Sequence, residues 1–568
     1  MRFSKLLTAA AYAATFAQAR YTGIGVHIPK ERVPLPAQGL FDYSIAVGDN
    51  RWDEAYHLVT HPEQGPWSIR STAWYAAALL HRYRSADDQR PTSTRDDSKA
   101  FRAIDNILKA QLNDTYGPAW AGTFKLSPDE PFPTKDSPLY YPRPYGSQDP
   151  TSRELVATEL IQLMEEFEGI LGKQHEWAIK DALEITAAAA MRRNGTFPEG
   201  DDLTVGYINT ALVRSLVVGW IGRRLNNKEY IDFANSQGSQ ILNLFKDNGE
   251  LGEDALSESG LPSYYGLDLW ALAANIKYGP PDSTMTHGAQ YIMTELWRDV
   301  AAHWNPYLGN LVAPYDNSYT RDLSTQAIQI ALFSWGIFGY GYGPQIPRGE
   351  LGFLRDGTQG ASLALVMETT SKLMARETFE PLTNRTAWEG WKFVNRTVSD
   401  GLGKHTRRTA SSWMSIILTI GVQPIDEDET RDERFVPAIV HWASDKMHAP
   451  WPYVSFFSLY PSAATIDAVA GRNSLTVSYP NPAQEGARIF TYALSNVPPG
   501  WTISGNHVID GFESLPCLDV KVDAPGLIKQ PVTYGDTHRN HMIYNISYVV
   551  PDGFKGVPKM EFQFKYTC

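Results

Sequence analysis

In the middle of the chain, turn residues, a loop carboxylate and a long apolar run follow one another in the same order twice. Each copy begins with an Asn-Gly turn and ends in a run that is apolar on every side, which predicts a buried helix. The residues at equal offsets in the two copies are Asn194, Gly195, Phe197, Glu199 and Gly206, then Asn248, Gly249, Leu251, Glu253 and Gly260. Between the copies, residues 228–245 are apolar on one face only, which is typical of a helix covering a buried one.

These two kinds of helix recur on both sides of the repeat. Besides the run after Gly206, helices are predicted at 67–83, 98–112, 152–171, 175–193, 228–245, 264–276, 283–304, 323–340, 359–377, 387–399 and 407–421. Two stretches differ: 21–48 is interrupted by proline and glycine and is expected to wrap without forming a helix, and 116–150 is a long loop and a candidate lid. About twelve helices in six hairpins predict an (α/α)6 toroid over residues 20–421.

The pattern changes after the last predicted helix. Residues 422–436 are rich in Asp and Glu and are expected to form a solvated acidic linker. Beyond them, alternating apolar and polar residues predict strands at 474–479, 487–494, 517–522, 541–550 and 559–566. The fold class expected is therefore mainly α, an (α/α)6 toroid followed by an antiparallel β-sandwich at 437–568.

The N-terminus and the cysteines indicate a secreted protein or one of the secretory-pathway lumen. Residues 1–19 have the basic start, apolar run and small-residue cleavage pattern of a signal peptide. Five glycosylation sequons agree with this route: Asn113, Asn194, Asn384, Asn395 and Asn545. The two cysteines, Cys517 and Cys568, both fall in the predicted sandwich, so an intradomain disulfide is expected, with two free buried thiols as the alternative.

The net charge of the chain restricts the classes of ligand that it is expected to bind. The formal net charge is −12, and loss of Arg2 and Lys5 with the signal peptide makes it −14, which argues against nucleic acid and other polyanions as ligands. No segment after the signal peptide is long and apolar enough for a membrane anchor, and no ligand spacing for a metal or cofactor is present. We expect small apolar or aromatic substrates; the oligomeric state is open.

Residues that open the inner helices are expected to meet in one funnel lined by aromatic and a few polar side chains. The candidate catalytic residues are Asn317, Tyr319, Arg321 and His405. The candidate substrate-binding residues are Trp67, Arg70, Trp74, Glu199, Tyr207, Tyr264, Tyr265, Asp322 and Trp413. Ordinary structural roles stay open as alternatives, since carboxylates before helices cap them and buried aromatic rings fill cores.

The loop from Asn194 to Gly200, with Tyr207 downstream, resembles the Asx-Gly-Ser/Thr-Phe loop of the toroid polysaccharide lyases. That resemblance implies a uronide lyase with an amide or cation on the substrate carboxylate, a base and an acid. Where the family has a histidine after this loop, the chain has Pro198 and Glu199. A glycoside hydrolase would instead use two carboxylates, with Glu199, Glu253 and Asp322 as candidates.

A second resemblance covers the whole layout. The segments 67–83 and 315–344, together with the signal peptide and the C-terminal strands, resemble the fungal hetero-Diels-Alderases of tropolonic sesquiterpene biosynthesis. The resemblance implies a cofactor-free cycloaddition between a tropolone o-quinone methide and a humulene-type sesquiterpene, with polar donors on the quinone methide oxygen. The sequence thus favours a pericyclase, with a carbohydrate-active enzyme as the alternative and a binding protein without activity as a third hypothesis.

Overall fold

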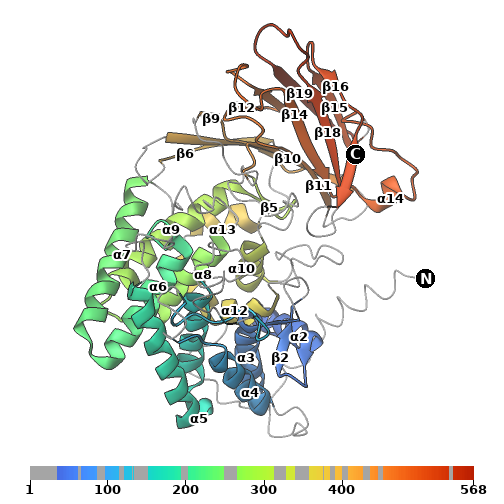
Figure 1. Cartoon of the computed structure of the whole chain (residues 1–568). Helices are drawn as coiled ribbons and strands as arrows, with labels where there is room; N and C mark the ends of the chain where they lie inside the picture. The colour runs from blue at the N-terminus through green and yellow to red at the C-terminus, as the bar shows by residue number, and fades with distance from the viewer. Residues whose placement is uncertain are drawn as a thin grey trace.

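The computed structural model describes most of the chain between Leu35 and Cys568. The described ranges are 35–61, 66–85, 96–113, 120–130, 132, 151–192, 203–248, 265–312, 328–339, 357–374, 376–383, 390–399, 407–426, 435–445, 452–513, 515–536 and 542–568. A helical part and a part made of two β-sheets lie one above the other (Figure 1).

Six inner helices of the helical part form a closed ring. They are α3 (Ile69–Arg84), the first half of α5 (Ser152–Arg192), α6 (Ile208–Leu225), α8 (Tyr265–Tyr278), α10 (Ile328–Phe338) and α12 (Gly360–Leu373). Each packs against the next in this order, and α12 packs against α3, which closes the ring. The sequences of α6 and α8 are apolar all round and these helices are buried on most sides, as predicted.

Outer helices cover the ring. They are α2 (Leu35–Arg51), α4 (Asp96–Lys109), the second half of α5, α7 (Lys228–Asn248), α9 (Thr284–His303) and α13 (Arg376–Thr383). α4 packs on α3, α7 on α6 and α9 on α8, while α2 packs on α10 and α12. The chain therefore returns to its beginning, and the (α/α)6 toroid that the sequence predicts is confirmed.

The inner helices run parallel, because their C-terminal ends meet at one place. α5 bends at Phe167 and Gly172. Just before this bend, the Glu166 carboxylate accepts a hydrogen bond from the Tyr278 hydroxyl of α8 at 2.8 Å, and the Glu166 carbonyl accepts one from Arg84 of α3 at 2.9 Å. The carboxylate of the neighbouring Glu165 accepts a hydrogen bond at 2.6 Å from the indole N–H of Trp220, which lies on α6. The N-terminal ends of these four helices consequently lie together at the opposite end of the ring.

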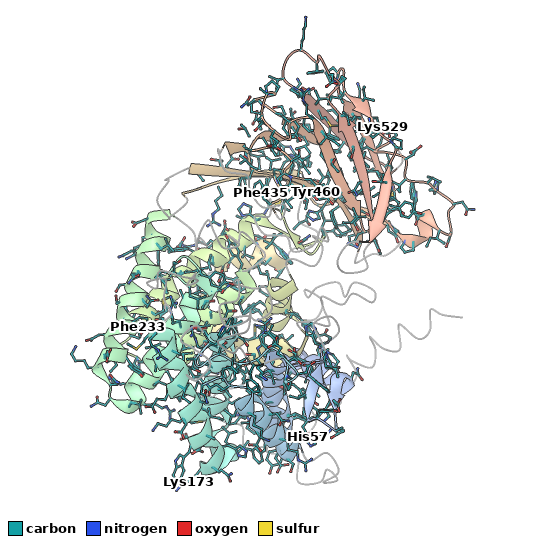
Figure 2. The ribbon with its side chains drawn as sticks, viewed as in Figure 1. His57, Lys173, Phe233, Phe435, Tyr460 and Lys529 are labelled. Carbon is teal, nitrogen blue, oxygen red and sulfur yellow. A yellow bond between two sulfur atoms is a disulfide. The ribbon has the colours of Figure 1, made fainter. Side chains whose placement is uncertain are left out.

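That opposite end faces the sheets. Lys173, just after the bend of α5, lies at the end of the helical part furthest from the sheets (Figure 2). At the other end, the short strands β4 (Trp304–Asn305) and β5 (Asn310–Leu311) contact the sheet part. The Asn305 amide donates to the carbonyl of Ser415 at 2.9 Å, and Ser412 donates to the carbonyl of Val312 at 2.7 Å.

The β part is an antiparallel sandwich of a larger and a smaller sheet. The larger has the order β16-β18-β14-β11-β10-β8-β7-β6, with β17 on β18, and the smaller has the order β15-β19-β13-β12-β9. The larger contains β6 (Trp391–Ser399), β7 (Arg407–Ser415), β8 (Leu418–Val422), β10 (Ala438–Asp445), β11 (Tyr453–Leu459), β14 (Ile489–Ser495), β16 (Ile528–Lys529), β17 (Thr533–Asp536) and β18 (Met542–Val549). The smaller contains β9 (Ile425–Asp426), β12 (Thr465–Gly471), β13 (Ser474–Ser478), β15 (Leu518–Asp523) and β19 (Lys559–Tyr566).

Aromatic side chains join the two sheets. Phe457 and Tyr492 of the larger sheet contact Phe562 of the smaller one, with ring centroids 5.9 Å and 5.3 Å apart. These rings belong to one buried core that draws on both sheets. The predicted sandwich is confirmed, and the five predicted strands correspond to β13, β14, β15, β18 and β19.

Several predictions of individual elements are wrong. Helices are expected at 387–399 and 407–421, but the described residues of these ranges form β6, β7 and β8, so the larger sheet begins within the segment assigned to the toroid. In β6, exposed and half-buried residues alternate from 391 to 397, which is the period of a strand and not of a helix. The expected linker at 422–436 contains β9, and Phe435 is buried in the sandwich core.

The N-terminal wrapping segment and the lid also differ from expectation. α2 occupies the end of the stretch expected to be non-helical; Pro36 is in its first turn, where no backbone N–H is needed. Part of the expected lid is packed instead, since Trp120 and Phe124 are buried and the backbone of 122–125 bonds to that of 110–112. The signal peptide, 1–19, lies outside the described residues.

Candidate active site

Polar side chains fill the part of the ring interior nearest to the sheets. In α5, residues 152–164 are buried on all sides and yet include Arg153, Glu154, Thr158, Glu159 and Gln162. A helix that faces only apolar neighbours has no reason to carry two carboxylates and a guanidinium at buried positions, because each is costly to remove from water. This concentration of buried polar groups marks the candidate site.

One cluster in this interior joins three inner helices. Ser362 of α12 lies within hydrogen-bond distance of the Glu159 carboxyl, the Gln162 amide oxygen and the indole N–H of Trp270, which donates at 3.0 Å. A single hydroxyl proton cannot serve both Glu159 and Gln162. All contacts are satisfied if Ser362 donates to Gln162 and a protonated Glu159 donates to Ser362.

The electrostatics agree with a protonated Glu159. Burial raises the pKa of Glu159 to about 8, although the hydrogen bond with Ser362 acts in the opposite direction. The other oxygen of this carboxyl, Oε1, is buried without a hydrogen-bond partner. Glu159 is therefore a neutral acid at pH 7.

Asp268 is a second buried acid at this end of the ring. It lies in the first turn of α8, it is 1% exposed, and its Oδ1 atom has no hydrogen-bond partner. Burial raises the pKa of Asp268 well above its usual value. A carboxyl group that keeps its proton at neutral pH can act as a general acid.

A buried ion pair supplies charge in the same region. The Arg153 guanidinium lies 2.6 Å from the Glu154 carboxylate in the first turn of α5, and both side chains are almost completely buried. The second carboxylate oxygen of Glu154 has no hydrogen-bond partner. The interior thus contains an ion-paired carboxyl group besides the buried carboxyl groups of Glu159 and Asp268.

At the boundary with the sheets lies a second polar group, the boundary cluster of Tyr265, Asp299, His303 and Arg396. The Tyr265 hydroxyl donates to Asp299 at 2.9 Å and accepts from Arg396 of β6 at 2.6 Å, and Arg396 also contacts Asp299 directly. His303 lies 3.2 Å from the other oxygen of Asp299. Burial acts to raise the pKa of Asp299, but His303, Arg396 and Tyr265 outweigh it and hold the pKa below its usual value.

Of the predicted site residues that the structure describes, Tyr265 lies in such a cluster. Arg70 and Trp74 lie together on the inner helix α3, with the guanidinium 5.3 Å from the ring centre. Trp67 instead belongs to β3 (Trp67–Ser68), and its indole donates to Asp53 at 3.1 Å. Tyr207, buried, immediately precedes α6.

Trp413 does not open an inner helix as predicted. It lies in β7, paired with Phe393 of β6 and Ile420 of β8, and it is buried in the core of the sandwich. Other predicted site residues lie outside the described residues, namely Asn317, Tyr319, Arg321, Asp322, His405, Glu199 and Tyr264. Glu253 of the second repeat copy is also outside them.

Sequence reasoning missed Glu154, Glu159 and Asp268. The available signal was the density of polar residues in a helix assigned to the interior, since 152–162 contains Arg153, Glu154, Glu159 and Gln162 in a predicted inner helix. Among the side chains that the structure describes, His, Cys, Asp and Glu form no group suited to hold a metal ion, and no helix is long and apolar enough to cross a membrane.

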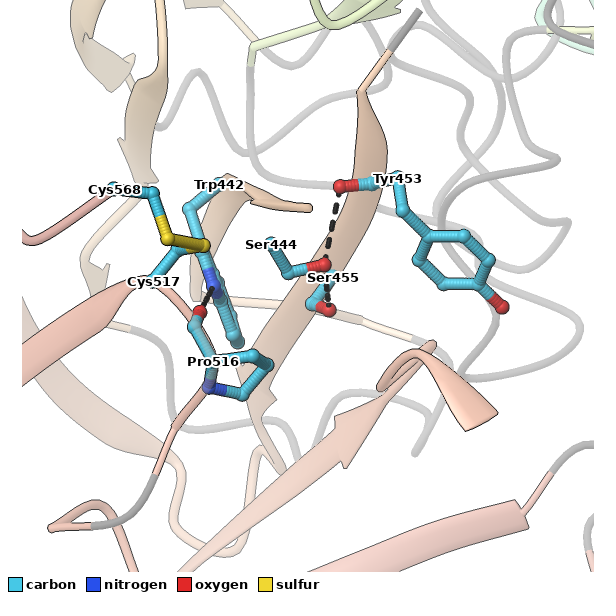
Figure 3. Close-up of a disulfide and its surroundings, with 7 residues drawn as sticks. All are labelled: Trp442, Ser444, Tyr453, Ser455, Pro516, Cys517 and Cys568. Carbon is cyan, nitrogen blue, oxygen red and sulfur yellow. Dashed lines mark hydrogen bonds between the residues drawn. A yellow bond between two sulfur atoms is a disulfide. The ribbon is translucent and has the colours of Figure 1, made fainter. Parts of the chain in front are cut away.

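The predicted disulfide between Cys517 and Cys568 is confirmed, with a Cα–Cα distance of 4.9 Å (Figure 3). It ties the start of β15 to the C-terminus, beside Trp442, whose indole donates to the carbonyl of Pro516 at 2.8 Å. Of the sequon asparagines, Asn113 and Asn395 are exposed and Asn545 is half-buried, whereas Asn194 and Asn384 lie outside the described residues.

Comparison with known proteins gives two family models. One, described as "Domain of unknown function (DUF8769)", matches residues 38–368, and the other, described as "Domain of unknown function (DUF8770)", matches residues 392–565. The first range covers most of the helical part, from within α2 to within α12, and the second begins in β6. No curated protein matches the chain.

Solved structures of polysaccharide lyases are similar at a low level. A chondroitin AC lyase of Streptomyces coelicolor A3 is 10% identical with a TM-score of 0.39, over 98% of this chain and 83% of that one. A xanthan lyase of Paenibacillus is 9% identical with a TM-score of 0.37, over 98% and 59%. A heparinase III is 8% identical with a TM-score of 0.30, over 99% and 90%. Values this low carry no information about function.

Proposed function

The chain belongs to the family described as a domain of unknown function (DUF8769), and from that premise we propose that it is an enzyme that cleaves glycosidic bonds by general acid catalysis. The proposed active site is the polar interior of the ring at the end that faces the sheets. Its groups are carboxyl, amide, hydroxyl and indole, which suit a ligand that presents many hydroxyl groups and apolar sugar faces.

One observation carries this proposal. Asp268 is fully buried, has an oxygen without a partner, and has a pKa raised well above its usual value. Cleavage of a glycosidic bond needs a proton for the leaving oxygen, and an acid that is still protonated at neutral pH supplies it. Among the described residues, Oδ1 of Asp268 has no hydrogen-bond partner, and we explain this buried carboxyl group by a chemical role.

The second carboxyl group of the mechanism is assigned to Glu154. Its carboxyl group is ion-paired with the Arg153 guanidinium at 2.6 Å, and we assign to it the role of base or nucleophile. Glu159 is assigned a positioning role, because its carboxyl is joined to Ser362, which also contacts Gln162. Asn317, Tyr319 and Arg321, which precede α10 in the chain and lie outside the described residues, stay candidates from the sequence.

Hydrolysis is favoured over elimination. A lyase acts on a uronide polymer, and a chain with a formal net charge of −12 repels such a polyanion. A glycoside hydrolase acting on a neutral glycan meets no such repulsion. It also uses two carboxyl groups, the roles that we assign to Asp268 and Glu154.

A cofactor-free cycloaddition, implied by the resemblance to the hetero-Diels-Alderases, has less support. It calls for an apolar cup that shapes two hydrophobic reactants, and it needs no proton transfer. The described interior contains Glu154, Glu159 and Asp268, which such a reaction would not use. None of the proteins named above is a Diels-Alderase.

The test is a screen of the secreted protein against glycans. Neutral polymers such as xylan, mannan and β-glucan, and acidic ones such as chondroitin sulphate and xanthan, are incubated separately, and both reducing ends and unsaturated uronide absorbance are followed. The proposal predicts reducing ends from a neutral polymer without the absorbance. Absorbance from an acidic polymer would establish a lyase instead. Release from none, together with adduct formation from an o-quinone methide and a humulene-type sesquiterpene, would overturn the proposal.

A further inference from the structure

Strand β6 presents two large aromatic side chains to solvent. Along Trp391–Ser399, residues 391, 393, 395 and 397 are exposed, whereas 392, 394 and 396 are half-buried. Trp391 is 49% exposed and Phe393 is 43% exposed, and the Arg472 guanidinium lies 5.9 Å from the Trp391 ring. Adjacent exposed rings of this size on a soluble protein call for a partner.

β6 is also the last strand of the larger sheet. It pairs with β7 on one side and has no strand on the other among the described residues. An edge strand with free backbone groups and exposed aromatic residues invites pairing with another chain, and proteins block such edges with bulky or charged groups.

The same face carries a glycosylation sequon. Asn395 and Thr397 follow Phe393 at intervals of two, so Phe393, Asn395 and Thr397 project to one side of the strand. Arg396, the middle residue of the sequon, points the other way and is bound to Tyr265 and Asp299 in the boundary cluster. This contact fixes which face of β6 the sequon presents.

We propose that Asn395 carries an N-linked glycan whose first sugar packs against the ring of Phe393. In the modification, the Asn395 amide nitrogen forms a bond to the anomeric carbon of a lipid-linked oligosaccharide, the diphosphate leaves, and the amide loses one proton. Residues two apart on a strand are separated by about 7 Å, so the apolar face of an attached sugar reaches the neighbouring ring. The glycan would cover the exposed rings and block the edge.

The other described sequons lack this arrangement. Two residues before Asn113 is Gln111, whose amide donates to the Ala182 carbonyl at 2.9 Å and to Thr186 at 3.0 Å. Two residues before Asn545 is Ile543, which is buried. Among the sequons that the structure describes, Asn395 is therefore the one with an exposed aromatic ring two residues before it. Asn113 is its matched control.

The full chain is produced in a secretory eukaryotic host, and occupancy of each sequon is read from glycopeptide masses. Four forms are then compared by thermal unfolding: the parent, Phe393→Ala, Asn395→Gln and the double variant. We expect Asn395 to be occupied in the parent, and its glycan to raise Tm by about 2 °C when Phe393 is present and by much less in Phe393→Ala. Phe393→Ala keeps the sequon, so its occupancy is measured as well.

The control cycle pairs Asn113→Gln with Phe393→Ala, and the two changes should be additive in Tm. An unmodified Asn395 in the secreted protein would overturn the proposal. So would an equal gain in Tm from the Asn395 glycan with and without Phe393. Neither result bears on glycosidic cleavage, which is measured separately.

Discussion

At the scale of single residues, the chain keeps carboxyl groups where apolar side chains would be more stable. Glu159 and Asp268 are both fully buried on inner helices, and each has an oxygen without a hydrogen-bond partner. Burial raises the pKa of both groups, so each group lowers the stability of the folded chain as pH rises above the pKa that it has in the unfolded chain. Such a cost is common at sites where stability is given up for activity.

Replacing Glu159 by Gln should raise stability at neutral pH. The pKa of Glu159 is about 8 in the folded chain, and about 4.3 is usual in an unfolded one. The parent's free energy of unfolding therefore falls as pH rises from about 4 towards 8, and Glu159→Gln should remove this decline, gaining about 3 kcal/mol at pH 7. Urea unfolding of the parent and of Glu159→Gln at pH 5 and pH 8 measures this difference in the free energy of unfolding.

The matched control is Glu165→Gln. Glu165 is partly exposed and is ion-paired with Arg224 at 2.8 Å, so its loss should reduce stability slightly at pH 8 and bring no gain. If Glu159→Gln and Glu165→Gln changed stability equally at both pH values, Glu159 would not be the buried neutral acid described above.

Gly48 is a residue whose missing side chain matters. A Cβ atom added at this position of α2 would overlap the ring of Tyr75 on α3. Gly48→Ala should therefore cost about 2 kcal/mol, because two packed helices must separate. Gly169→Ala in α5 is the control: a Cβ there meets nothing within 4 Å, and the change should stabilise the chain slightly. Denaturant unfolding that ranked the two variants in the opposite order would contradict the packing of α2 on the ring.

Residue identity predicts the site only in part. Tyr265 is predicted because it opens an apolar run, and it does belong to a polar cluster. Its partners Asp299 and Arg396 could not be predicted, because one lies on an outer helix and the other on a strand that the sequence assigns to a helix. Asp268 could not be predicted either, since a single carboxyl group in a helix is usually exposed.

At the scale of elements, apolar helices with clear signals at their ends are predicted well. α3 begins after Ser68 and α9 after Ser283, and in both cases the serine side chain accepts from the first turn, at the positions that the sequence indicates. Residues 391–399 and 407–421 are predicted wrongly, because β6 and β7 follow the helices without a change in composition. The apolar–polar alternation of these strands, with a period of two, is recognised only if these residues are not assumed to form further helices of the toroid.

The boundary cluster joins elements from the two parts, α8, α9 and β6. Arg396→Gln should remove the donors to Tyr265 and Asp299 and cost about 2 kcal/mol, because both acceptors are largely buried. Since the pKa of Asp299 lies below its usual value, the contribution should be present at neutral pH and be lost as pH falls through that pKa. Denaturant unfolding of parent and variant across pH 3 to 7 measures both effects.

Arg298→Gln is the control for this prediction. Arg298 is 47% exposed and pairs with Glu295 on the helix surface, so its replacement should change stability by at most about 0.5 kcal/mol. An Arg396→Gln variant as stable as Arg298→Gln at neutral pH would mean that the boundary cluster does not hold the two parts together.

At the scale of the whole molecule, a closed ring places the N-terminal ends of its inner helices against a sandwich. Closure was predictable, because the helices alternate between fully apolar and amphipathic and so need cover on both sides. The position of the sandwich over the polar end of the ring could not be predicted from the sequence. It depends on tertiary contacts such as Asn305 with Ser415 and Ser412 with Val312.

The disulfide should stabilise the sandwich independently of the ring. Cys517 and Cys568 enclose a separation of 51 residues, which corresponds to about 4 kcal/mol in a loop-entropy model. The double variant Cys517→Ser with Cys568→Ser should therefore lower the midpoint of the transition that reports on the β part. Reduction of the parent should give the same shift. A double variant that unfolds like the oxidised parent would show that the bond adds no stability.

The most direct test of the account is the rate of reducing-end release by Asp268→Asn on the neutral glycan that the parent cleaves. The control is Asp282→Asn, which removes an exposed carboxylate paired with Arg223. We predict that Asp268→Asn remains folded, is at least as stable as the parent at pH 7, and is slower by about a hundredfold or more, while Asp282→Asn keeps the parental rate. An Asp268→Asn variant that cleaves at the parental rate would contradict the assignment of the active site to the interior of the ring.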